Sequence, residues 1–147
     1  MTQVSIKNTA TNTLKSNNNW LSICQLNDIL PNMGCCALIN TADEQARQIA
    51  IFRIVATNGE EQLFAVDNYC PFSHANIISR GIVGDLNDKI VVASPLYKQH
   101  FELSSGQCLE DKSVFLTSYA VRLNGSTVEL AVSSPKAAPL AVKNKEQ

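Results

Sequence analysis

Long hydrophobic runs are absent from this chain of 147 residues. Its first segment, MTQVSIKNTATNTLKSNNNW, holds no apolar run of the length that secretory signal peptides need. Elsewhere no stretch approaches the run of about 18 apolar residues that predicts a transmembrane helix. We therefore expect a cytoplasmic protein without a membrane partner.

The sequence also lacks an excess of positive charge. It has 12 Lys and Arg against 13 Asp and Glu, which gives a formal net charge of −1. A general nucleic-acid binder needs a basic stripe that neutralises phosphates, and the sequence contains none. Hydrophobic residues make up 45% of the chain and charged residues 17%, as in ordinary globular domains. The composition thus predicts one globular domain without a nucleic-acid partner.

The five cysteines lack the pattern of a disulfide framework. Their number is odd, no Cys-x-x-Cys pair occurs, and the cytoplasm keeps thiols reduced. We expect Cys24, Cys35 and Cys36 to be small buried hydrophobic residues. Cys108 follows a turn and is expected to be buried in the same way, which leaves Cys70 as the cysteine with a motif around it.

Helical periodicity is scarce, and most of the chain has the pattern of short strands. WLSICQL alternates apolar and polar residues, and CCALIN, QIAIFRIVA, QLFAVD and KIVVAS are short segments rich in apolar residues. Asn58-Gly59 and Asn124-Gly125 each separate two such segments and predict β-hairpins. The expected strands cover residues 20–26, 35–40, 48–56, 62–67, 89–94, 119–123 and 126–132. Strands joined by short turns predict an antiparallel all-β domain.

Two local details and the domain limits can also be predicted. The last hairpin is expected to place alternating residues on one face of each strand, namely Tyr119, Val121 and Leu123 on the first and Val128, Leu130 and Val132 on the second. Residues 25–34 suit a short helical turn with Asn27 or Asp28 as its cap. Polar residues 1–18 predict a flexible N-terminal arm and residues 134–147 a flexible C-terminal tail, which leaves 19–133 as the β domain.

Two loops between the expected strands, NYCPFSH and SPLYKQHFELSSGQC, look like the halves of one metal site. Each opens with a small residue before proline, at Cys70 and at Ser94. With its flanking strands this region resembles a Rieske-type domain, a family that has Cys-x-His in a first loop and Cys-x-x-His in a second. The resemblance implies an all-β, Rieske-like antiparallel sandwich or small barrel with a loop subdomain of two hairpin-like loops.

The residues at the family's ligand positions depart from its pattern. Cys70 matches the first cysteine, but Phe72, Ser94 and Tyr97 stand where a histidine, a cysteine and a histidine belong. A histidine–cysteine cluster needs two thiolates on one iron and two imidazoles on the other, so these substitutions remove three of its four ligands. We expect a Rieske-like fold without a cluster, in which Phe72 and Tyr97 fill part of the cluster's space.

A narrower resemblance covers most of the domain. NYCPFSHANIISRGIVGD and VVASPLYKQHFELSSGQCLED resemble the small subunit of assimilatory NAD(P)H-dependent nitrite reductase. In that enzyme the large subunit binds NAD(P)H, FAD, siroheme and a [4Fe–4S] cluster and reduces nitrite to ammonium. The resemblance implies an accessory subunit that has no cofactor or catalytic residue of its own and contacts the large subunit. The choice between NADH and NADPH belongs to the large subunit and stays open.

The contact with a partner is expected at the segment LYKQH and at a neighbouring arginine. The candidate contact residues are Arg80, Tyr97, Lys98, Gln99 and His100. The alternative for this segment is a solvated loop in which Tyr97 packs inward. Arg80 itself could pair with Asp85 or Glu110, or stay free for a partner.

Three other functions stay open from the residues alone. The chain could be a Rieske-type [2Fe–2S] electron carrier with altered ligands. Cys70, His74, His100 and Cys108 offer two sulfur and two nitrogen ligands that zinc accepts, although their spacing matches no compact ligand loop. Finally, Cys70 could act as a nucleophile with His74 as its base, in a small-molecule enzyme.

Overall fold

The computed structural model describes residues 2–5, 20–40 and 46–131. The predicted tail 134–147 and most of the predicted arm lie outside the described residues, so the domain limits stay predictions. Within residues 1–18, Thr2–Ser5 form strand β1. No helix in the described part of the chain is long and apolar enough to cross a bilayer.

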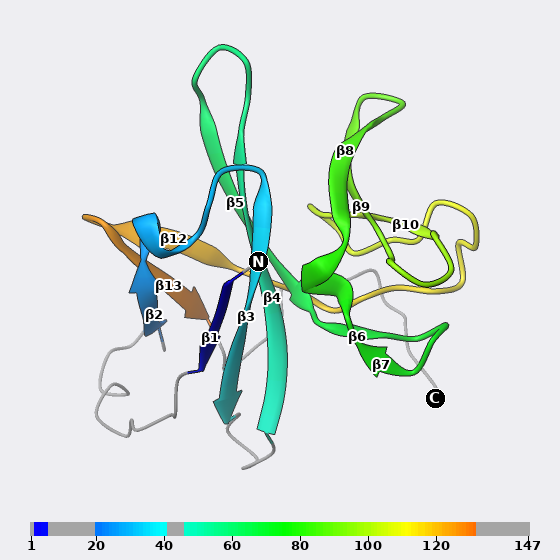
Figure 1. The fold of residues 1–147 in the computed structure, drawn as a ribbon, viewed down its shortest axis with the longest axis horizontal. Helices are drawn as coiled ribbons and strands as arrows, with labels where there is room; N and C mark the ends of the chain where they lie inside the picture. The colour runs from blue at the N-terminus through cyan, green and yellow to red at the C-terminus, as the bar shows by residue number, and fades with distance from the viewer. Residues whose placement is uncertain (1, 6–19, 41–45, 132–147) are drawn as a thin grey trace.

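Strands are the main regular structure of the described segments, and loops and turns connect them (Figure 1). They are β1 (Thr2–Ser5), β2 (Trp20–Gln25), β3 (Met33–Asn40), β4 (Ala46–Val55), β5 (Glu61–Asp67), β6 (Tyr69–Cys70), β7 (Ala75–Asn76), β8 (Ile82–Leu86), β9 (Lys89–Ala93), β10 (His100–Glu102), β11 (Ser118–Tyr119), β12 (Val121–Asn124) and β13 (Thr127–Ala131). Two short 3₁₀ helices, η2 (Leu26–Asp28) and η3 (Ile78–Arg80), lie between them. The all-β prediction is confirmed.

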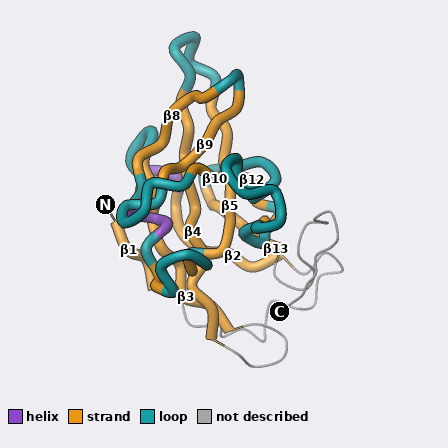
Figure 2. Tube along the Cα trace, turned by 90° about the vertical axis from the view of Figure 1, so that its right-hand side faces the viewer, coloured by secondary structure: helices purple, strands orange, loops and turns teal. Residues whose placement is uncertain are grey.

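The strands form a central sheet with a smaller sheet to either side (Figure 1). The central sheet has the order β1-β3-β4-β5-β11, and the flanking sheets have the orders β12-β13-β2 and β10-β9-β8. Strands β6 and β7 form a separate short pair. Neighbouring strands are antiparallel except for β1 and β3, which are parallel. The β4–β5 and β8–β9 hairpins extend in the same direction from the body, as Figures 1 and 2 both show.

Strand β4 is apolar on both faces, which explains the unbroken run QIAIFRIVA. Successive side chains of a strand point to opposite faces. Ile49 and Ile51 therefore join one buried cluster, whereas Ala50, Phe52 and Ile54 join another. The central sheet thus separates two cores.

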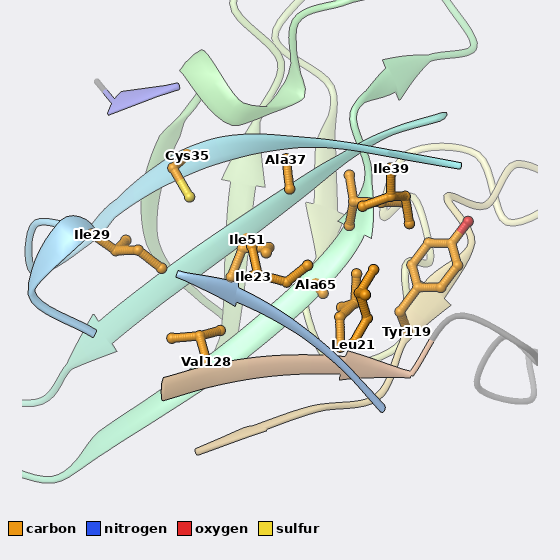
Figure 3. Packing of buried hydrophobic residues seen from close by; sticks show 12 residues of the cluster. Leu21, Ile23, Ile29, Cys35, Ala37, Ile39, Ile51, Ala65, Tyr119 and Val128 are labelled. Atoms are coloured by element: carbon orange, nitrogen blue, oxygen red, sulfur yellow. The ribbon is translucent and has the colours of Figure 1, made fainter. Parts of the chain in front are cut away.

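The first core lies between the central sheet and the β12-β13-β2 sheet (Figure 3). Leu21 and Ile23 from β2 and Val128 and Leu130 from β13 are buried in it. Val128 and Leu130 share one face of β13, as predicted, and Val132 lies outside the described residues. In the preceding strand β12, Val121 and Leu123 alternate with Arg122 as predicted, and Leu123 is 42% exposed.

The strand that carries Leu123 is shorter than predicted. Tyr119 belongs to β11, which pairs with β5, and the chain then continues into β12 as part of another sheet. The turn also moves by one residue, because Asn124 pairs with Thr127 and leaves Gly125 and Ser126 as the loop. Gly125 has a φ of 67°, a left-handed conformation that glycine adopts without a steric cost.

The predicted helical turn is present, but its cap differs. Gln25, not Asn27 or Asp28, precedes the first residue of η2. Asp28 is the third residue of this turn, and its carboxylate accepts a hydrogen bond of 2.9 Å from the Gln25 backbone N–H. It therefore acts as the acidic half of a capping box.

The second core joins the central sheet to the loop subdomain, which we define as β6 to β10 with the loops between them. Residues from β4 and β5 pack there against Ile78, Val92 and Phe101. The two motif loops lie in this subdomain, after β6 and after β9.

Candidate functional site

The two motif loops have the same backbone plan. The carbonyl of Cys70 accepts a hydrogen bond from the His74 N–H at 2.8 Å, and that of Ser94 accepts one from the Lys98 N–H at 3.0 Å. His74 and Lys98 both have a left-handed backbone, with φ of 58° and 64°. Each loop begins with a proline, whose ring fixes φ at the start of the turn. The similar sequences CPFSH and SPLYK therefore form turns of the same backbone geometry.

The loops meet at their first residues. Cys70 Sγ and Ser94 Oγ are 3.7 Å apart, and both residues are fully buried. Two ligand atoms that each lie about 2.3 Å from one tetrahedral metal would be separated by about 3.8 Å. The positions of the two family cysteines thus keep the spacing of a ligand pair, although a hydroxyl has replaced one thiol.

The two remaining ligand positions lie in different surroundings. Phe72 is half-buried against the second core, with its ring centroid 6.1 Å from that of Phe101. It has no atom that can bind a metal. Tyr97 is 60% exposed, so the expectation that it fills the cluster's space, or packs inward, is wrong. The side chains at the four positions therefore do not fit a two-cysteine, two-histidine cluster.

The environment of Cys70 favours its ionised form. Burial acts to raise the pKa of the Cys70 thiol, but the polar groups of Ser73, Phe72 and Ser94 around the sulfur outweigh it, and the pKa is lowered. A loop that places backbone N–H groups around a sulfur suits a thiolate. Because Cys70 is fully buried, a substrate has no direct access to it.

The zinc and nucleophile hypotheses find no support in the side-chain geometry. His74 Nδ1 is 3.1 Å from the Tyr69 hydroxyl, and His100 Nδ1 is 2.6 Å from Glu110 Oε2. Cys108 is buried in the second core, where burial raises the pKa of its thiol. Across residues 2–5, 20–40 and 46–131, no three His, Cys, Asp or Glu side chains are grouped so that they could hold a metal ion.

Exposed side chains, several of them aromatic or apolar, lie in both motif loops or directly beside them. We define the loop-tip surface as Tyr69, His74, Leu96, Tyr97 and Lys98, all of which are exposed. Tyr69, Leu96 and Tyr97 are 45%, 58% and 60% exposed. Tyr69 was not among the predicted contact residues, although it immediately precedes Cys70, and Leu96 was predicted only as the first residue of the segment LYKQH.

The other predicted contact residues are placed less uniformly. Gln99 and His100 are half-buried, and the Gln99 Oε1 atom is buried without a hydrogen-bond partner. Arg80 is exposed in η3 and lines a cleft whose lining includes none of residues 96–100. It forms no ion pair with Asp85, Glu110 or another described residue. A role of these residues in partner contact stays a prediction.

Comparison with known proteins identifies the family to which this fold belongs. The profile of the Rieske-like [2Fe-2S] domain family matches residues 19–131. The small subunit of nitrite reductase (NADH) from Escherichia coli K12 is 40% identical over 111 residues, which are 76% of this chain and 95% of that protein. The chain belongs to the family of nitrite reductase small subunits. The predicted Rieske-like fold and the narrower resemblance are both confirmed.

Two further similarities place this small subunit among its relatives. The crystal structure of a putative NADH-dependent nitrite reductase small subunit from Mycobacterium tuberculosis superimposes with a TM-score of 0.66 at 33% identity, covering 81% of this chain and 96% of that one. The large subunit of nitrite reductase [NAD(P)H] from Klebsiella oxytoca is 34% identical over 109 residues. That segment is 74% of this chain but 10% of the Klebsiella protein.

Proposed function

We propose that this chain is the accessory small subunit of a cytoplasmic, assimilatory NAD(P)H-dependent nitrite reductase. It acts by contact with a large catalytic subunit and carries no iron–sulfur cluster itself. FAD, siroheme and a [4Fe–4S] cluster belong to that large subunit, which reduces nitrite to ammonium. No residue of the small subunit then takes part in the chemistry, and its contribution is to bind and hold the catalytic chain.

The observation that carries this proposal is the pair of sequence similarities. A relative at 40% identity is a nitrite reductase small subunit, and a domain at 34% identity lies within a nitrite reductase large subunit. In the Klebsiella protein the domain is covalently joined to the rest of a large subunit. A separate chain of the same family would have to reach the same place by non-covalent binding.

The absence of a cluster is supported by the donor set. Cys70 is the one family ligand present at the four positions, Phe72 has no donor atom, and Tyr97 is exposed. The competing function is an electron carrier with altered ligands, and the observation in its favour is the 3.7 Å spacing of Cys70 Sγ and Ser94 Oγ. A hydroxyl is a poor replacement for a thiolate on iron, so this spacing favours a former ligand pair over a working one.

The loop-tip surface is the part of the chain best suited to dock the large subunit. Aromatic residues are enriched at the centres of protein interfaces, and truncating such an anchor commonly weakens binding by 2 kcal/mol or more, or about 30-fold. Tyr97 already stands 60% exposed, so its removal costs the fold of the free chain little. Lys98 lies beside it and adds a charge that would guide association.

Affinity purification of the tagged full chain from its native host, grown on nitrate, tests the proposal. We expect a co-purifying large subunit that carries flavin and siroheme. Tyr97→Ala should weaken the complex by more than about tenfold, and Lys98→Glu by several-fold at low salt. The matched controls are Leu123→Ala, which truncates an exposed residue on the other sheet, and Lys112→Glu. Recovery of the wild-type chain alone while the large subunit is being made would contradict the proposal.

A further inference from the structure

A cleft of about 790 Å³ opens beside the loop subdomain, on the face of the central sheet that carries the second core. Its walls come from β3 and β4 on one side and from η3 and β8 on the other. The lining residues are Asn32, Met33, Gly34, Cys36, Gln48, Asn68, Asn76, Ser79, Arg80, Gly81, Ile82 and Val83. Its volume lies within the range of about 300–1,000 Å³ that is usual for small-molecule sites. Of the predicted contact residues only Arg80 lines this cleft, and none of the family's four ligand positions does.

The floor of the cleft is a fixed network of polar side chains. Asn68 is 2% exposed, donates to Gln48 Oε1 at 3.0 Å and accepts from the Ser79 N–H at 2.6 Å. The Cys36 thiol donates to the same Gln48 oxygen at 3.2 Å. Gln48 Oε1 therefore accepts two hydrogen bonds, whereas the Nε2 group of this cleft-lining residue donates none to another described residue.

Close packing of backbone holds the wall that carries Arg80. A Cβ atom on Gly34 would lie 2.6 Å from the Phe52 ring and 2.9 Å from the Ser79 carbonyl oxygen. A Cβ atom on Gly81 would lie 2.3 Å from the Ala93 carbonyl oxygen. Glycine at position 34 therefore lets η3 lie directly against the central sheet, and glycine at position 81 lets the chain after Arg80 lie directly against β9.

Arg80 gives the described lining of the cleft its charge. Arg80 is the one charged residue of its lining, which contains no Asp, Glu, Lys or His. Its guanidinium makes no ion pair with the described residues. Burial raises the pKa of the Cys36 thiol, and the positive charge of Arg80 acts in the opposite direction without outweighing it. The cation and the floor thus face the same space. Arginine in such a setting binds a carboxylate through two parallel hydrogen bonds.

The rim adds apolar surface next to that cation. Met33 is 38% exposed and Ile82 is 75% exposed, and both line the cleft together with half-buried Val83. A phosphate group commonly uses more than one cation or the N-terminus of a helix, and this cleft offers neither. A singly charged group with an apolar body matches the lining better.

We propose that this cleft binds a small organic carboxylate, with the carboxylate on Arg80 and the Gln48 Nε2 group and an apolar body against Met33 and Ile82. The lining of this site includes no residue of the loop-tip surface, through which we propose that the large subunit binds. It gives the family's fold a ligand-binding function on the side away from the first core.

Titration of the full chain with benzoate, followed by ¹H–¹⁵N NMR, tests the site, and benzamide serves as the uncharged probe of the same shape. We expect benzoate to shift the backbone signals of Gly34 and Gly81 and the side-chain amide of Gln48. Benzamide should bind at least tenfold more weakly, because it cannot pair with the guanidinium. Acetate should also bind more weakly than benzoate, because it has no apolar body for the rim.

The variant Arg80→Gln should weaken benzoate binding at least tenfold and leave benzamide binding unchanged. Lys112→Gln removes the same charge from another exposed residue and should change neither, and unfolding midpoints report whether each variant keeps its fold. The proposal is overturned if benzoate causes no shift at 50 mM, if the shifts lie elsewhere, or if benzoate and benzamide bind equally. A glutamate residue blocked at both ends as amides serves as a probe for an acidic side chain of a partner protein. If it binds more tightly than benzoate, the small-molecule assignment is overturned in favour of such a side chain.

Discussion

The substitution Phe72→His restores one family ligand and tests what Phe72 does. Phe72 is half-buried, so about half of the 1.5–3 kcal/mol gained by burying a phenylalanine is at stake. Its ring pair with Phe101, at 6.1 Å between centroids and 45° between planes, contributes about another 0.5–1.5 kcal/mol. Imidazole recovers part of both contributions. We expect a loss of about 1–2 kcal/mol in the free energy of unfolding.

Urea unfolding with a parallel iron determination measures both parts of this prediction. The Phe72→His variant should lower the unfolding midpoint and, after incubation with iron and sulfide under reducing conditions, bind no iron. Phe72→Leu is the control, since it keeps an apolar side chain and should cost about 1 kcal/mol or less. The triple variant Phe72→His, Ser94→Cys and Tyr97→His supplies all four ligands on loops that keep the 3.7 Å spacing, and should bind iron.

Two results would refute this reasoning. Stoichiometric iron in the single variant would mean that the loops still form a working site with two of the four family ligands. An unchanged unfolding midpoint would mean that Phe72 does not stabilise the loop subdomain.

Two further predictions concern buried polar groups. Asn68→Ala should lower the free energy of unfolding by about 2–4 kcal/mol, measured in urea, because it leaves the buried Ser79 N–H without its acceptor and removes one of the two donors to Gln48 Oε1. A loss below about 0.5 kcal/mol would contradict the network. Burial raises the pKa of the Asp67 carboxyl above its ordinary value of 3.8, although Tyr119 and Arg47 act to lower it. Because the folded state holds this proton more tightly, the stability of the wild type relative to Asp67→Asn is greatest below pH 3.8 and falls as the pH rises through the folded-state pKa. Unfolding curves of both proteins at several pH values measure this difference in stability. A difference that grows with pH would contradict the prediction.

The fold could be predicted from the sequence wherever short-range pattern decides it. QIAIFRIVA has an apolar residue at nearly every position, as a strand buried on both faces requires, and β4 lies between the two cores. The predicted strand with Tyr119, Val121 and Leu123 on one face is wrong at Tyr119, because the chain changes sheets after this residue. Pairing with distant β5 decides that change, and local alternation carries no signal of it.

The candidate site was predictable in its loops and not in its cleft. The proline turns after Cys70 and Ser94 are visible in the sequence, and the structure brings these residues together. Tyr97 was placed wrongly, because a ligand position in a family pattern does not say which way a replacement side chain points. The cleft joins Cys36, Gln48 and Asn68 to Arg80 through tertiary packing alone.

Adding the purified chain to its large subunit, with the iron content of each preparation measured, tests the central claim most directly. NAD(P)H oxidation in the presence of nitrite is followed until the activity decays. We expect iron-free chain to increase the total nitrite reduced, and the Tyr97→Ala variant to reach the same effect only at higher concentration. An increase that follows the iron content of the added chain, or no increase at all, would contradict the account of a cluster-free subunit that acts by contact.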